Sequence, residues 1–106
     1  MQRVGTSGSP FFKTMIKWIK TLFNRRAPIE CEIVEDLGDT GRFILYRGGR
    51  RAGRMLVECA GDLARITITT RRRVPAHIMA FFIVGLREYL QTHGGVTKFE
   101  TIFHKE

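Results

Sequence analysis

The chain has 106 residues, of which 43% are hydrophobic and 10% aromatic. Its 18 Lys and Arg residues against 10 Asp and Glu residues give a net charge of +8. This length suits one domain with one modest core, and the hydrophobic content excludes a chain that is disordered throughout. The charge favours a negatively charged partner, namely nucleic acid, an anionic lipid, a phosphorylated ligand or an acidic protein. The alternative is a basic surface that only keeps the protein soluble.

The chain begins with a polar stretch and then a helical pattern. Residues 1–9 are rich in Gly and Ser, which predicts a disordered tail before a single domain over residues 10–106. Ser9 and Pro10 form a typical helix start, and apolar residues then recur at helical spacing over residues 10–25 with lysines on the other face. The apolar set is Phe12, Met15, Ile16, Ile19, Leu22 and Phe23.

This amphipathic helix, which Pro28 ends, has several interpretations. Its apolar face can cover one side of a sheet, or it can dock on an anionic membrane surface or a partner protein. Its acid-free, basic sequence also fits a mitochondrial targeting segment. We predict a cytoplasmic protein, with mitochondrial and virion-associated locations as alternatives.

Alternation with a period of two follows from Ile29 onwards and predicts an antiparallel meander of four strands. Turn residues separate these strands at 38–41, 47–53 and 60–62. The strand cores are residues 29–33, 43–46, 55–57 and 63–70.

A second helix is expected from Pro75 to the stop at residues 92–95, and Val96–Phe103 follows as a fifth strand. The helix is apolar nearly all round but far too short to cross a bilayer, so we expect it to be buried against the sheet. The element order α-β-β-β-β-α-β predicts an α+β fold, with a mainly antiparallel sheet and the helices packed on it.

The two cysteines, Cys31 and Cys59, fall within expected strands and have neither CxxC spacing nor a histidine nearby. This pattern predicts no metal site. It favours buried reduced thiols, with a disulfide between adjacent strands as the alternative.

The first candidate site is the junction between the fourth strand and the second helix. Free amides at a helix start attract anions, and arginine side chains add charge-assisted donors suited to phosphate. The alternative is a solvated charge run before a helix. The candidate ligand-binding residues are Arg71, Arg72, Arg73, Val74 and Ala76.

The order of elements over residues 30–103, together with this junction, resembles the core of the GNAT (N-acetyltransferase) superfamily. In that family an Arg/Gln-x-x-Gly-x-Gly/Ala loop holds the pyrophosphate of acetyl-CoA. Arg71-x-x-Val74-x-Ala76 keeps the first and last positions, and Val74 replaces the middle glycine. The resemblance implies acetyl-CoA as a ligand.

For catalysis, Glu58 and Tyr89 are the nearby candidate groups, and their structural alternatives are an edge carboxylate and a packing tyrosine. We leave the catalytic residues unassigned, because fold analogy alone does not establish an activity. We therefore favour a small binding protein for an acyl-CoA type of ligand, without a metal, over an acyl-CoA N-acyltransferase.

The second candidate is an arginine-rich surface around the 47–54 hairpin. A glycine hairpin with several arginines can follow a nucleic-acid backbone, and Tyr46 beside it can stack on a base. The alternative is an exposed turn without a partner. The nucleic-acid-binding residues under this hypothesis are Arg47, Arg50, Arg51, Arg54, Arg65, Arg71, Arg72 and Arg73. A third class is an accessory or assembly protein, viral for example, that docks through residues 10–25.

Overall fold

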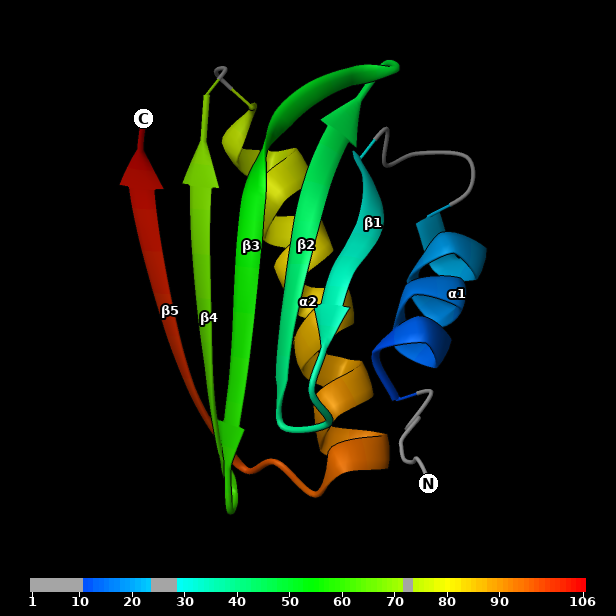
Figure 1. Ribbon diagram of the computed structural model, residues 1–106, viewed down its shortest axis with the longest axis vertical. Helices are drawn as coiled ribbons and strands as arrows, with labels where there is room; N and C mark the ends of the chain where they lie inside the picture. Colours follow the sequence, from blue (N-terminus) through cyan, green and yellow to red (C-terminus); the bar gives the residue numbers. More distant parts are fainter. Residues whose placement is uncertain (1–10, 24–28, 72–73) are drawn as a thin grey trace.

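The computed structural model describes residues 11–23, 29–71 and 74–106, and these form two helices and one five-stranded sheet (Figure 1). The order α-β-β-β-β-α-β is the predicted one. The predicted tail at 1–9, the helix start at Ser9 and Pro10, and Arg72 and Arg73 lie outside the described residues. The elements are α1 (Phe11–Phe23), β1 (Ile29–Asp36), β2 (Thr40–Arg47), β3 (Arg50–Ala60), β4 (Leu63–Thr70), α2 (Ala76–Gly94) and β5 (Lys98–Lys105).

The strands lie in the sheet in sequence order, from β1 to β5. The pairs from β1 to β4 are antiparallel, as expected for a meander, and β5 runs parallel to β4 after the chain has crossed through α2. Both helices lie on the same side of the sheet, so that the other face has no helix over it (Figure 1). We call this second surface the helix-free face.

The apolar stripe of α1 forms part of the core. Phe12, Met15 and Ile19 are buried, and the Phe12 ring packs edge-on against Phe43 of β2 with 5.6 Å between centroids. The helix therefore covers the sheet beside α2. The predicted membrane or protein contact through residues 10–25 stays a prediction, and a membrane would have to compete with the core for this same stripe. Within the described residues, neither helix combines the length and apolar character that a membrane span requires.

Several of the predicted boundaries were wrong: Thr40 and Gly41, expected in a turn, belong to β2, and the fifth strand extends to Lys105. Two further differences have a clear local cause. The 47–53 segment, expected as a connection, contains only a two-residue turn, because Gly48 and Gly49 adopt the positive φ angles (59° and 77°) that close a hairpin directly. Pairing therefore begins at Arg50, and β3 is longer than predicted. The fifth strand starts at Lys98 rather than at Val96, because the Val96 N–H donates to the carbonyl oxygen of Leu90 and stays with the end of α2.

The two cysteines are free thiols that lie on β1 and β3, with β2 between them. A disulfide between adjacent strands, the alternative expected from the sequence, is therefore not the arrangement found. Burial raises the pKa of the Cys31 thiol to about 12. Burial, together with the negative charge of Asp39, also raises the pKa of Cys59.

We expect Cys31 to resist alkylation in the native protein. With a pKa of about 12, on the order of one Cys31 thiol in ten thousand is ionised at about pH 8, and the thiolate is the reactive form. Timed iodoacetamide labelling followed by peptide mass spectrometry measures both cysteines in one sample. Cys31 should react slowest, Cys59 faster, and both at full speed in denaturant. Labelling of native Cys31 at the rate of denatured Cys31 would contradict its burial.

Candidate functional site

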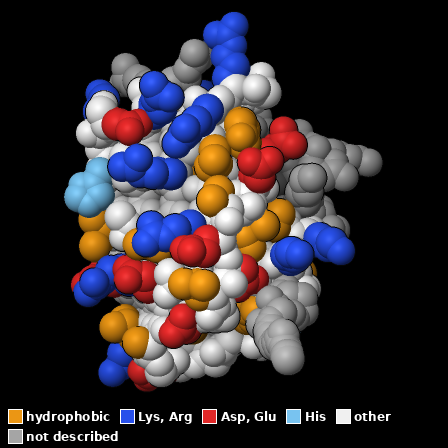
Figure 2. All heavy atoms as spheres, in the orientation of Figure 1, with side chains coloured by type: hydrophobic (Ala, Val, Ile, Leu, Met, Phe, Trp, Pro, Cys, Tyr) orange, Lys and Arg blue, Asp and Glu red, His pale blue; other side chains and the backbone are white. Residues whose placement is uncertain are grey.

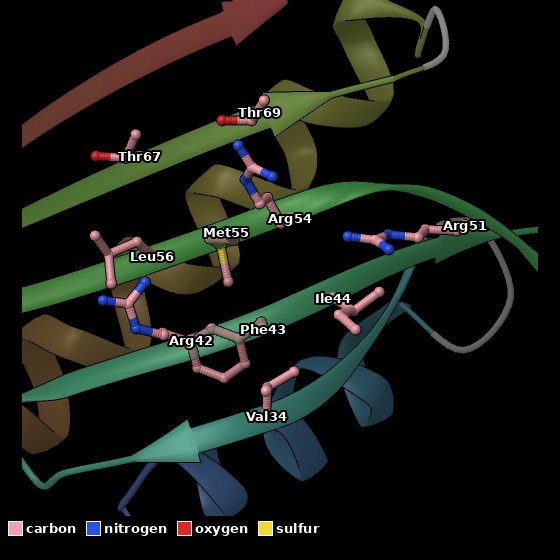
Figure 3. Close-up of a pocket in the computed structure, with 10 residues that line it drawn as sticks. All are labelled: Val34, Arg42, Phe43, Ile44, Arg51, Arg54, Met55, Leu56, Thr67 and Thr69. Atoms are coloured by element: carbon pink, nitrogen blue, oxygen red, sulfur yellow. The ribbon is translucent and has the colours of Figure 1, made fainter. Parts of the chain in front are cut away.

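The helix-free face carries an open hollow of about 410 Å³ across β2, β3 and β4 (Figure 3). Arg42, Arg51 and Arg54 surround it, and Ile44 and Leu56 form an aliphatic floor between them. In the close-up, Arg54 points from β3 toward Thr69 on β4, and Arg42 extends toward Leu56. Cationic side chains at the rim and an apolar floor give one surface two kinds of contact.

A β-bulge explains how Arg51 and Arg54 come to share this face. Side chains alternate along a strand, so residues three apart normally point to opposite faces. The register shifts within β3, where Arg51 pairs with Tyr46 and Arg54 pairs with Ile44, and Ala52 is the extra residue. Because Tyr46 and Ile44 are two apart on β2, both arginines lie on the helix-free face.

Gly53 makes the close approach of β3 and β4 beside this bulge possible. A Cβ atom at Gly53 would lie 2.1 Å from the carbonyl oxygen of Thr69, which belongs to the backbone of β4 and cannot move aside cheaply. The same region is fixed by a hydrogen bond of 2.8 Å from the Arg71 N–H to the carbonyl oxygen of Ala52. The bulge is thus held between its two neighbouring strands.

A second bulge places an acidic partner beside Arg42. In β1 the register shifts between Ile33 and Glu35, so that Glu35 pairs with Arg42 on β2. The Arg42 Nε–H donates to Glu35 Oε1 at 3.0 Å. The Glu35 carboxylate therefore partly neutralises the positive charge of Arg42 at the edge of the hollow.

The other arginines near the hollow differ in their charge balance. Arg47 pairs with the buried Ile29 and with Arg50, so by strand alternation these two belong to the helix-covered side of the sheet, beside the β2–β3 turn. Arg54 and Arg71 both contact the carboxylate of Glu106, and Arg65 is paired with Glu100. Within residues 29–71 and 74–106, no carboxylate forms an ion pair with Arg47, Arg50 or Arg51. Figure 2 shows Lys and Arg side chains gathered over the upper part of the helix-free face and more acidic side chains below them. The uncompensated positive charge thus lies at the end of the sheet where the β2–β3 turn is (Figure 1).

Of the described arginines that the sequence proposed for nucleic acid, the structure brings Arg51, Arg54 and Arg71 together on one end of the helix-free face. Arg51 and Arg54 line the hollow, Arg47 and Arg50 flank the turn next to it, and Arg71 follows the end of β4 at the same end of the sheet. Arg65 is on the helix-free face too, but toward the other end of β4, where it pairs in register with Glu58 of β3 and Glu100 of β5.

Sequence reasoning missed several residues of this face. They are Arg42, Ile44, Leu56, Thr67 and Thr69, which line the hollow. The alternation of Arg42, Ile44 and Tyr46 on one side of their strand was visible in the sequence. The sequence did not show which side of the sheet the helices would cover.

The proposed acyl-CoA corner has a different character. The N–H groups of Ile78 and Met79 donate to the carbonyl oxygen of Pro75, whereas those of Ala76 and His77 have no backbone acceptor within the described chain. A second open hollow of about 410 Å³ adjoins this corner and is mostly apolar. Its lining is Thr70, Val74, Ala76, Met79, Ala80 and Phe103. Val74, which stands where the resembled motif has glycine, packs against the core.

The two candidate catalytic groups lie far from this corner. Glu58 is six residues along β3 from Ala52, a separation of roughly 20 Å at 3.3 Å per residue. Tyr89 lies near the other end of α2, where its hydroxyl donates to the carbonyl oxygen of Phe11 at 3.5 Å and its ring stacks on His93. Burial raises the pKa of Tyr89. These contacts match the packing alternative for Tyr89, and the catalytic residues stay unassigned.

Comparison with known proteins adds no assignment: no family model matches the chain, and no curated protein or solved structure matches it significantly. The described residues also contain no cluster of His, Cys, Asp or Glu side chains suited to holding a metal ion. The GNAT resemblance thus depends on the element order and the Arg71–Ala76 segment alone.

Proposed function

We propose that the protein binds single-stranded nucleic acid on the helix-free face of its sheet. The observation that carries this proposal is the hollow in which Arg51, Arg54 and Arg42 stand around an aliphatic floor. This surface is separate from the helices, so a ligand can occupy it without disturbing the core. It is also wide, because it crosses three strands.

The chemistry of the rim suits phosphate groups. Guanidinium groups form charge-assisted hydrogen bonds with phosphate oxygens, and the Thr67 and Thr69 hydroxyls can add neutral ones. Arg51, which has no carboxylate partner in the described chain, is the group best placed to take the first phosphate. The +8 net charge of the chain attracts a polyanion to the protein as a whole, and Arg51 then offers it a contact in the hollow.

The apolar floor of the hollow favours single-stranded nucleic acid as the ligand rather than a duplex. Ile44 and Leu56 offer apolar area to the face of a base, and Tyr46 lies next to Arg51 across the β2–β3 pair. A duplex exposes its phosphates but keeps its base faces stacked, whereas a single strand can place bases on a sheet and phosphates at its edge. A mixed apolar and cationic surface therefore favours the single strand.

The salt dependence of affinity tests this proposal. Contacts to three or four phosphates should make log K fall with log salt at a slope of about −2 to −3, at about 0.7 per contact for single strands. Fluorescence anisotropy with a labelled oligothymidylate and its duplex form measures both slopes. Single-strand binding should be the tighter of the two. A flat slope would contradict phosphate binding, and tighter duplex binding would contradict the role of the floor.

A second candidate is an acyl-CoA type of ligand at the Arg71–Ala76 corner, without acyl transfer. The observation in its favour is the apolar hollow beside the amides of Ala76 and His77, which have no backbone acceptor among residues 29–71 and 74–106. A pyrophosphate could bind the amides and Arg71, and an acyl arm could enter the hollow. Isothermal titration with acetyl-CoA at moderate salt tests it, and absence of heat at millimolar ligand would remove it.

A further inference from the structure

Arg54 and Arg71 hold one carboxylate between them at the edge of the candidate face. Arg54 Nη1 lies 3.6 Å from Glu106 Oε2, and Arg71 Nε lies 3.5 Å from Glu106 Oε1. Each arginine thus faces a different oxygen of the same anion. Two guanidinium groups that converge on one anion are an arrangement suited to a phosphate group.

Backbone pairing fixes the main chain of all three residues of this cluster, with Arg54 opposite Thr69 of β4. The Glu106 N–H donates to the carbonyl oxygen of Thr70 at 2.9 Å, which continues the pairing of β5 with β4. The Arg71 N–H donates to Ala52, next to Arg54 in the bulged part of β3. The sheet therefore places the main chain of both arginines side by side, and their guanidinium groups extend from it to Glu106.

We propose that Arg54 and Arg71 form a phosphate subsite of the helix-free face, and that the Glu106 carboxylate occupies this subsite until a phosphate group displaces it. The proposal rests on the proposed function, because it adds a subsite and its internal competitor to the same face. All three side chains are about half exposed, with 59%, 58% and 42% of the area of Arg54, Arg71 and Glu106 accessible. Exposed ion pairs contribute little stability, so displacement is cheap.

Neutralising the competitor should strengthen binding. We expect Glu106→Gln to raise the affinity for an oligothymidylate about three- to tenfold at low salt, since one opposing charge leaves the subsite. Glu88→Gln on α2 is the matched control, because it changes the net charge equally but lies on the helix-covered side. It should change the affinity less than twofold, by the same electrostatic argument at long range. In the Arg54→Ala background, Glu106→Gln should lose most of its effect.

Other results would reject either the subsite or the proposed function. If the wild type binds and Glu106→Gln binds no better than Glu88→Gln, the subsite is rejected while the proposed function stands. An undiminished gain in the Arg54→Ala background also rejects it. If no variant binds the oligonucleotide, the proposed function fails, and titration with inorganic pyrophosphate decides the subsite alone. Stronger NMR shifts at the Arg54 and Arg71 Nε–H groups in Glu106→Gln than in wild type would support it, and absence of shifts would overturn it.

Discussion

Replacing Arg51 and Arg54 together with alanine should weaken single-strand binding on the order of 50-fold at about 50 mM salt. Both side chains line the hollow, and both are exposed, so their removal takes away phosphate contacts without opening the core. The slope of log K against log salt should also become shallower by about 1.4, at about 0.7 for each lost phosphate contact. Anisotropy titrations at several salt concentrations measure both quantities.

The matched control for this pair is Lys13→Ala with Lys17→Ala. It removes the same net charge from α1, on the opposite side of the sheet. If nucleic acid lies on the helix-free face, this control should reduce the affinity only a few-fold through the general field of the protein. Equal weakening by the two double variants would show that the charge matters and the hollow does not, which would reject the proposed location.

The second large effect is on stability. Phe12→Ala should lower the free energy of unfolding by about 3 to 5 kcal/mol, because it empties a fully buried aromatic site between α1 and the sheet. That loss is a large part of the roughly 5–15 kcal/mol that a domain of this size possesses. Urea unfolding followed by circular dichroism measures it, with the midpoint expected to fall and the slope to stay constant.

Lys13→Ala is the control for this substitution, since Lys13 is the exposed neighbour of Phe12 in the same helix. A surface change of this kind should stay within about 0.5 kcal/mol of wild type. The comparison separates a core helix from one that only rests on the domain. If Phe12→Ala cost no more than Lys13→Ala, α1 would be a detachable element, and docking on a membrane or partner would become the better account of residues 10–25.

Local patterns were enough to predict the order of the elements. Alternation such as that of Ala64, Ile66 and Ile68 predicted strands, and the apolar stripe of residues 12, 15 and 19 predicted a helix that covers a sheet. Glycine pairs and prolines marked the turns and ends. These signals involve only a few neighbouring residues, so they can be recognised in the sequence before the tertiary fold is known.

The sequence indicated some of the arginines of the candidate face, but not the rest of its residues or their arrangement, because these depend on long-range pairing. The bulge at Ala52 moves Arg51 and Arg54 to one face, and nothing within β3 alone reveals it. Gly53, beside the bulge, allows β4 to approach closely on the other edge of β3. The contacts of Glu106 with Arg54 and Arg71 join residues that are 52 and 35 positions apart in the numbering of the chain. Such contacts follow from the order of the strands in the sheet, which local sequence patterns do not predict.

NMR mapping of the bound surface shows directly whether nucleic acid lies on the helix-free face. Backbone amide shifts of the isotopically labelled protein should be recorded while an oligothymidylate is added. We expect the largest changes on β2, β3 and β4 around Ile44, Arg51, Arg54 and Thr69, with small changes on α1 and α2. Changes concentrated at residues 74–80 or along α1, with the hollow unaffected, would contradict it.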